Sequence, residues 1–173
     1  AVKQPGQLTR RIVAELVDEI LLVEEPAIEH AIALLINVEK TVVEGAGAAG
    51  VAAILAHPGR FAGKRVGTVL CGGNIDQRLL ASVLLRDLVS QGRLARLRIR
   101  LGDKAGELAR VAGLIGEAGG NIVDVAHQRV FSHLPAKDAL IEVAVETRDD
   151  QQLAAIVERL GSAGYHVVRL AED

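Results

Sequence analysis

Two stretches of this chain share one pattern: LARVAGLIGEAGGNIVDV (residues 108–125) and LAAIVERLGSAGYHVVRL (residues 153–170). In each, apolar residues recur at the spacing of one helical face, and a turn of small residues with glycine then leads into a short apolar run. Corresponding positions lie 45 residues apart throughout, so that residue 153 matches residue 108. Each stretch therefore predicts a helix followed by a strand, and the two together indicate a tandem repeat.

Further strands are expected beside these helices. Residues 93–101, RLARLRIRL, alternate apolar side chains with arginines, as in a strand with one buried face. Residues 122–129 and 139–146 have the same character and are joined by the loop FSHLPAKD (131–138). The order βαββαβ predicts a ferredoxin-like domain, in which an antiparallel sheet carries two helices on one face.

The first half of the chain follows a different pattern. Helical stretches alternate with short continuous apolar runs at 20–23, 41–43 and 66–70. This alternation is typical of a parallel sheet covered on both faces, although the segment is too short for a whole one. We therefore predict an α/β chain in which a partial open parallel α/β sheet (1–92) precedes the ferredoxin-like domain (93–173).

Composition and charge restrict the function classes. Half of the 173 residues are hydrophobic and the formal net charge is −2, which favours a globular protein and argues against nucleic acid as a partner. No apolar run approaches the roughly 18 residues of a membrane span, so no membrane partner is expected. The single cysteine, Cys71, excludes a disulfide framework, and the five histidines are scattered. We predict a cytoplasmic protein without a metal site.

Two glycine-rich motifs are the main candidates for a site in the first half. Residues 45–50, GAGAAG, match the dinucleotide fingerprint G-x-G-x-x-G, but Cys71 stands where an acid is needed and Glu44 abuts the first glycine. We therefore reject a dinucleotide and expect close helix packing. Cys71 itself could be a reactive thiol, a small buried residue, or a weak hydrogen-bonding group that faces a cofactor. The context Gly72-Gly73-Asn74 favours the third interpretation.

The second half offers two glycine turns and a row of arginines. Residues 102–107 and 119–121 could present free N–H groups to a carboxylate, but ordinary turns are an equally good interpretation. The arginines at 96, 98 and 100 could contact nucleic acid, although these strands carry no aromatic residues on which bases could stack. A solvated face, or a dimer contact with acids opposite, is the favoured explanation.

VVEGAGAAGVAAIL (42–55) and VGTVLCGGNID (66–76) resemble the end of the catalytic domain of threonine dehydratases, pyridoxal-phosphate enzymes of fold type II. The 45-residue repeat resembles their regulatory ACT domain, and the similarity extends over essentially the whole chain. The resemblance implies that Cys71 takes the place of a serine that faces the pyridine nitrogen of the cofactor. It implies cofactor-binding residues Glu44, Gly45, Cys71, Gly72, Gly73 and Asn74, and effector-binding residues Asp103, Lys104, Ala105, Gly106, Gly120, Asn121 and Ile122.

The resemblance is incomplete at the chemical centre. No lysine of this chain stands in the Schiff-base motif of the family, and the phosphate-binding loop is absent. We therefore expect no catalytic residue here, and pyridoxal phosphate only in a full-length enzyme. The implied function is the C-terminal segment of a threonine dehydratase, with an ACT domain that senses isoleucine or valine and forms homo-oligomers. The alternative is a free-standing amino-acid-binding regulator with residues 1–92 as a dimerisation arm.

Overall fold

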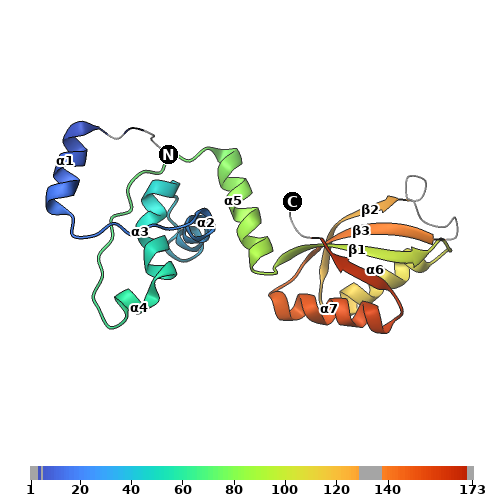
Figure 1. Cartoon of the computed structure of the whole chain (residues 1–173). Coiled ribbons are helices and arrows are strands. Elements are labelled where there is room, and N and C mark those ends of the chain that lie inside the picture. The colour runs from blue at the N-terminus through green and yellow to red at the C-terminus, as the bar shows by residue number, and fades with distance from the viewer. Residues whose placement is uncertain (1–3, 5, 129–137, 171–173) are drawn as a thin grey trace. The chain divides into compact units, whose positions relative to one another are not determined.

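The computed structural model describes residues 4, 6–128 and 138–170 of the chain. Contacts divide the chain into two compact units, Ala1–Leu79 and Leu80–Asp173. The first unit contains α1 (Gln7–Leu16), α2 (Glu25–Leu34), the π-helical turn η1 (Leu35–Glu39), α3 (Gly45–Ala56) and α4 (Pro58–Phe61), and α5 (Gln77–Ser90) spans the division. The second unit contains β1 (Leu94–Gly102), α6 (Glu107–Glu117), β2 (Asn121–Gln128), β3 (Asp138–Glu146), α7 (Asp150–Ser162) and β4 (His166–Arg169) (Figure 1).

The core of the first unit is small and lies between α2 and α3. The buried residues are mostly alanines, with Ile32, Leu35 and Val43 as the larger side chains. Glycines let α3 approach the segment 68–72 closely. A Cβ on Gly47 would lie 2.2 Å from the carbonyl oxygen of Cys71, and a Cβ on Gly50 would lie 2.1 Å from Thr68 Oγ1. These contacts confirm that residues 45–50 serve close packing.

The strands expected in the first half do not form. Residues 20–23, 41–43 and 66–70 have no strand assignment, and β1 is the first strand among the described residues. Val69 is 80% exposed, although a strand of a covered parallel sheet would bury it. The physical reason is that a strand needs a neighbour to satisfy its N–H and C=O groups, and none of these segments pairs with another. The three segments therefore form no strands among the described residues.

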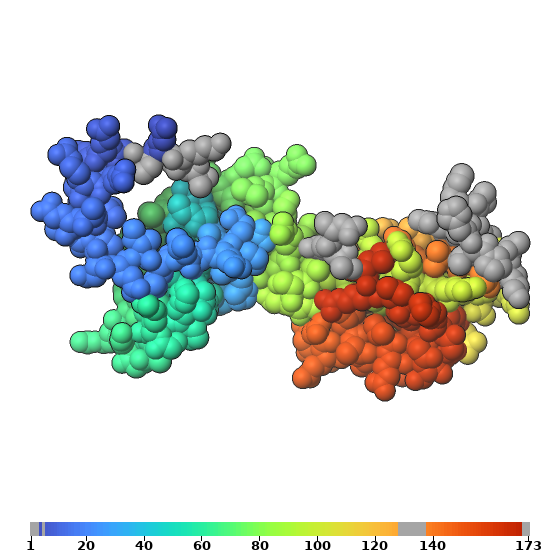
Figure 2. Space-filling model, viewed as in Figure 1, coloured from blue at the N-terminus to red at the C-terminus, as the bar shows by residue number. Residues whose placement is uncertain are grey.

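Helix α1 presents its apolar stripe to solvent. It buries none of its residues, and the large side chains Leu8, Ile12 and Leu16 are exposed. The exposed apolar surface continues beyond the helix to Ile20 and Leu22, and Figure 2 shows much of this segment at the surface. An amphipathic helix gains its stability from burial of its apolar face. The apolar stripe of α1 is not buried by the described residues.

Helix α5 begins with a side-chain cap. The Asp76 carboxylate accepts hydrogen bonds from the backbone N–H groups of Arg78 and Leu79, at 3.0 and 3.1 Å. This is an N-cap, which satisfies donors that the first helical turn leaves unpaired. Val83 of this helix is buried.

The second unit has the predicted ferredoxin-like topology. Its four strands are antiparallel in the order β2-β3-β1-β4. Leu97, Ile99 and Leu101 of β1 are buried, whereas the arginines between them are exposed. Helices α6 and α7 cover one face of this sheet (Figure 1). The mixed α/β class and the βαββαβ domain are confirmed, while the loop at 131–138 lies almost wholly outside the described residues.

The repeat produces two similar helices with one difference. Val111 and Ile115 of α6 and their counterparts Ile156 and Leu160 of α7 are all fully buried. Leu108 and Leu153, the first equivalent positions of the two repeats, differ in burial: Leu153 is 2% exposed and Leu108 is 40% exposed. The start of α6 is therefore less covered than the start of α7. The division of the chain by contacts falls within α5, and the domain boundary at 92/93 stays a prediction.

Candidate functional site

The structure brings together part of the predicted cofactor site. The Glu44 N–H donates to the Gly72 carbonyl oxygen at 3.0 Å, which joins the start of α3 to the 71–73 turn. Gly72 has φ of +79°, and a Cβ there would lie 2.5 Å from Glu44 Oε1. Only glycine fits this turn, for both its conformation and its close contact. Gly45 follows Glu44 directly, so Glu44, Gly45 and the 71–74 turn form one continuous surface, called the wall below.

The outer members of this wall are open to solvent. Cys71 is exposed, and so are Gly73 and Asn74. A thiol is a weak hydrogen-bonding group, so Cys71 could contact a ring nitrogen without forming a strong ion pair. Of the lysines, Lys40, Lys64 and Lys104 lie within the described residues, and Lys40 Nζ donates to the Asn37 carbonyl oxygen at 2.7 Å. The wall thus supplies neither a phosphate cradle nor an activated amine.

The predicted effector residues fall at opposite ends of the sheet domain. Asp103, Lys104, Ala105 and Gly106 form the loop after β1, and Gly102 pairs with Asp138 at the start of β3. By contrast, Gly120, Asn121 and Ile122 form the start of β2, and Asn121 pairs with Glu146 at the end of β3. At a rise of about 3.3 Å per residue, these ends lie about 25 Å apart. One copy of the chain does not combine them into a single site.

The two ends also differ in how they are packed. The Lys104 N–H donates to the Gly102 carbonyl oxygen at 2.8 Å, and Gly106, with φ of +91°, precedes α6 without a side-chain cap. At the other end, a Cβ on Gly120 would meet Ile156 Cδ1 at 2.7 Å. The loop after β1 is open, whereas the start of β2 is closely packed.

A cavity of about 320 Å³ lies beside the open loop. Its most polar side chains are Arg100, Glu107, Arg110, Asp138, Tyr165 and His166. Tyr165 is not among the residues predicted from the sequence, although the 45-residue offset places it at the position of Gly120 and places His166 at that of Asn121. That correspondence was the signal that could have identified this turn.

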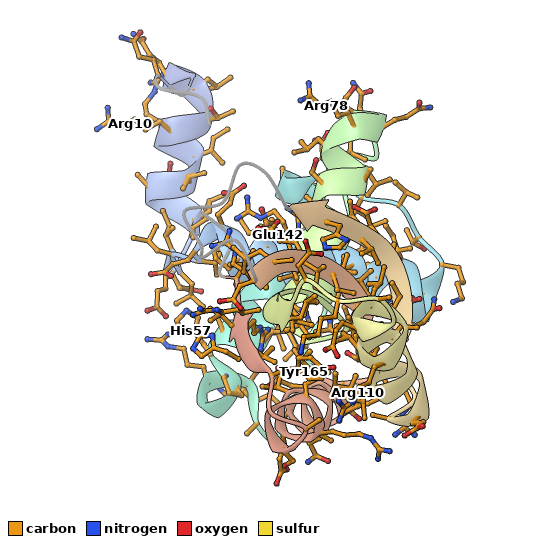
Figure 3. All side chains as sticks on the ribbon, turned by 90° about the vertical axis from the view of Figure 1, so that its right-hand side faces the viewer. Arg10, His57, Arg78, Arg110, Glu142 and Tyr165 are labelled. Atoms are coloured by element: carbon orange, nitrogen blue, oxygen red, sulfur yellow. The ribbon has the colours of Figure 1, made fainter. Side chains whose placement is uncertain are left out.

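Tyr165 links the two sides of the cavity. Its hydroxyl donates to Glu107 Oε2 at 2.9 Å, and the Arg110 guanidinium carbon lies 5.9 Å from the centre of the phenol ring (Figure 3). Burial raises the pKa of Tyr165 above its usual value, and the hydrogen bond and charge of Glu107 raise it further, while Arg110 opposes them. The phenol therefore stays protonated and holds the Glu107 carboxylate in place.

Two of the three arginines in the row on β1 pair with acids of the same chain. Arg98 Nη2 lies 2.7 Å from Glu142 Oε1 on β3, and Arg100 pairs with Asp138 on the same strand. Both carboxylates are less exposed than the arginines that they pair with. The acids opposite Arg98 and Arg100 thus come from the neighbouring strand, which reduces the positive field that a nucleic acid would need.

Two other site classes find no support in the part of the chain that the structure describes. No three histidine, cysteine, aspartate or glutamate residues gather there as a possible metal site. Among the same residues, no helix is long and apolar enough to cross a membrane.

Comparison with known families matches each half of the chain to a different one. Residues 1–72 match the family of pyridoxal-phosphate-dependent enzymes, and residues 95–164 match the ACT domain. An ACT domain from a GTP pyrophosphokinase of Chlorobium tepidum is among the similar solved structures, with 20% identity, 44% of this chain and 96% of that chain covered, and a TM-score of 0.37.

Similar curated proteins include ammonia-lyases and dehydratases of threonine. An L-threonine ammonia-lyase of Thermotoga maritima is 38% identical over 96% of this chain and 41% of its own length. Another, from Geobacter sulfurreducens, is 40% identical over 96% of this chain and 42% of its own length. The chain thus spans about two fifths of these relatives. The matches of residues 1–72 to the pyridoxal-phosphate-dependent enzymes and of residues 95–164 to the ACT domain agree with the threonine dehydratase resemblance of the sequence.

Proposed function

We propose that this chain is the C-terminal part of a threonine ammonia-lyase, the enzyme that converts threonine to 2-oxobutanoate and ammonia. The observation that carries the proposal is the alignment of 96% of the chain with two such enzymes at 38% and 40% identity. In the full enzyme, residues 1–92 complete the cofactor pocket and residues 93–173 regulate it. The chain alone is not expected to be catalytic.

Pyridoxal phosphate, when bound, supplies an electron sink for cleavage at the amino-acid carbon. The contribution of this chain is the wall formed by Glu44, Gly45 and the 71–74 turn. The hydrogen bond from Glu44 to Gly72 holds the turn, so that Cys71 can lie against the ring nitrogen. A thiol there would offer the ring nitrogen only a weak hydrogen bond.

The exposed apolar surface of the first unit supports the proposal that another part of the catalytic domain packs against it. The stripe on α1 is unburied, and the apolar segment 66–70 has no strand to pair with. Large exposed apolar patches mark interaction surfaces. We infer that the rest of the catalytic domain covers this surface and supplies the missing strands, the Schiff-base lysine and the phosphate loop.

The second unit is proposed to bind a branched-chain amino acid, isoleucine or valine, through the loop 103–106 and residues 120–122. Because these two groups lie at opposite ends of one copy, a second copy would have to bring them together. This geometry supports a homo-oligomer joined through ACT domains. The lone cysteine of the sequence supports a cytoplasmic location for the enzyme.

A chimera tests the catalytic proposal. This chain would replace the aligned segment of the Geobacter sulfurreducens relative, and ammonia release from threonine would be measured. Gly72→Val should abolish activity because its Cβ would collide with Glu44, whereas Gly59→Ala, with nothing within 4 Å of its Cβ, should not. A folded but inactive chimera would contradict the catalytic role.

Thermal unfolding with each of the twenty amino acids tests the sensing proposal. Ligand at about a hundred times Kd should add roughly 2.7 kcal/mol of stability. A shift confined to isoleucine or valine supports the proposed sensor. If such a shift occurs while every chimera is inactive, the free-standing regulator becomes the better explanation.

A further inference from the structure

Buried polar side chains occur where α5 ends and α7 begins. Among the residues that the structure describes, three polar or charged side chains are buried: Asp87, Thr147 and Gln152. Asp87 lies in the last turn of α5, Thr147 directly follows β3, and Gln152 lies in the first turn of α7. They belong to the segments 87–93 and 147–152, called the joint below, and each side chain is hydrogen-bonded. A buried polar group is costly unless it is paired, so these bonds favour one arrangement of the joint.

The end of α5 is held by three elements of the sheet domain. The Thr147 hydroxyl, just after β3, donates to the Gly92 carbonyl oxygen. Gly92 has φ of +65°, and a Cβ there would lie 2.4 Å from Asp150 Oδ1 at the start of α7. Arg169 of β4 places Nη1 2.9 Å from the same Asp150 oxygen and Nη2 3.5 Å from the Val89 carbonyl oxygen. The last turn of α5 therefore moves with the sheet domain unless these contacts break.

The first turn of α7 also contacts the turn that precedes β2. Gln152 Nε2 donates to the Ala118 carbonyl oxygen at 2.9 Å. Gly119 has φ of +79°, and a Cβ there would lie 2.7 Å from the same Gln152 nitrogen. The predicted effector residues 120–122 follow directly. Gly164 is the repeat equivalent of Gly119, and a Cβ there would meet nothing within 4 Å, so the close contact is particular to the start of α7.

Helix α5 connects the joint to the wall along the chain. The 71–74 turn of the wall is followed by the Asp76 cap and then by α5. At its other end, α5 leads through Gly92 into β1. A change at the start of α7 would therefore act on the helix that joins the wall to the sheet domain.

We propose that the joint transmits the effector signal to α5. An amino acid bound at residues 120–122 displaces the 118–119 turn and, through Gln152, the start of α7. The displacement moves Asp150, which loosens the hold of Arg169 on the last turn of α5. This inference rests on the proposed amino-acid sensing and adds its route through the chain. Gln152, Asp150 and Arg169 are positioning residues, because they act through α7 and α5 and not on the cofactor.

Amide hydrogen exchange of the whole chain, with and without saturating isoleucine or valine, tests the proposal. The N–H groups of residues 91–93 close the last turn of α5, and the ligand should speed their exchange by about fivefold or more. In Arg169→Gln, these groups should exchange fast without ligand, and the ligand should add less than about twofold. Because coupling is reciprocal, Arg169→Gln should also bind the amino acid more tightly, which isothermal titration calorimetry measures. A merely structural role for Arg169 would not tighten binding.

Two further variants accompany Arg169→Gln. Asp150→Ala breaks the same pair from the side of α7 and should give the same pattern. The matched control is Arg159→Gln, which makes the same chemical change on a similarly exposed arginine that pairs with Glu117 on α6. The control should keep the wild-type response and the wild-type Kd.

The outcomes separate this inference from the sensing proposal. Fast exchange and tighter binding in Arg169→Gln and Asp150→Ala, with Arg159→Gln unchanged, support the joint. If the wild-type chain binds isoleucine or valine but exchange at residues 91–93 does not respond, the inference is overturned and the sensing proposal stands. The same holds if Arg169→Gln keeps the full response. If the wild-type chain binds none of the twenty amino acids, both fail. Urea unfolding of each variant, followed by tyrosine fluorescence, verifies that its domain is folded.

Discussion

Gly120 offers a sharp test of how the sheet domain is packed. A Cβ at this position would lie 2.7 Å from Ile156 Cδ1, 2.9 Å from Ile115 Cγ2 and 3.0 Å from Val145 Cγ1. All three neighbours are fully buried. The Cδ1 methyl of Ile156 can move away by side-chain rotation. The methyl groups of Ile115 and Val145 are attached directly to a branched Cβ and have little rotational freedom. Gly120→Ala should therefore overpack the core.

The magnitude follows from two opposing terms. Overpacking a core costs about 1–3 kcal/mol. Alanine also lowers the entropy of the unfolded chain, which returns about 0.4–1 kcal/mol where the backbone is compatible, and Gly120 has no positive φ. The net loss should be about 1–2 kcal/mol, or a fall in Tm of roughly 5–10 °C for a domain of this size.

Gly113→Ala is the matched control. Gly113 lies inside α6, and nothing lies within 4 Å of its Cβ. The same chemical change should here stabilise the domain by about 0.5–1 kcal/mol, because glycine is a poor helix former. The two variants therefore differ in sign.

Urea unfolding followed by tyrosine fluorescence measures both variants. Tyr165 is the only tyrosine and the chain has no tryptophan, so the signal reports on the sheet domain alone. The reasoning is refuted if Gly120→Ala is as stable as the wild type, or if Gly113→Ala destabilises the domain as much as Gly120→Ala does.

Three further predictions concern single polar contacts. Because the pKa of Tyr165 is raised, the folded domain prefers the protonated phenol, so the contribution of this group to stability is present below about pH 10 and is lost as the pH rises through the raised pKa. The absorbance of tyrosinate should therefore appear at a higher pH in the folded chain than in urea, and Glu107→Gln should reduce this difference in pH. Asp149→Ala removes the cap on α7, where the carboxylate accepts from the Gln152 N–H at 2.8 Å, and should cost about 1 kcal/mol in urea unfolding, whereas Asp149→Asn should cost less. Glu142→Gln breaks the exposed pair with Arg98 and should cost no more than about 1 kcal/mol, an effect that added salt should diminish; a larger loss would mean that this face is covered in solution.

The sequence predicted the second unit well because its signals are local and repeated. The alternation in β1 and the paired apolar stripes of α6 and α7 each point to one buried face, and the structure buries them as expected. The same logic failed for residues 20–23, 41–43 and 66–70. Their apolar runs suit buried strands, but a strand forms only where a neighbour supplies hydrogen bonds, and this chain supplies none there.

The candidate sites divide in the same way. Sequence alone determined the glycine turn at 71–73 and the loop after β1, because glycine acts on its own backbone. Only the tertiary structure decided that Glu44 contacts Gly72, and that residues 103–106 and 120–122 lie at opposite ends of the sheet. It also placed Tyr165 against Glu107, 58 positions apart in the sequence. Such contacts depend on strand order and register, which the spacing of residues along one segment does not encode.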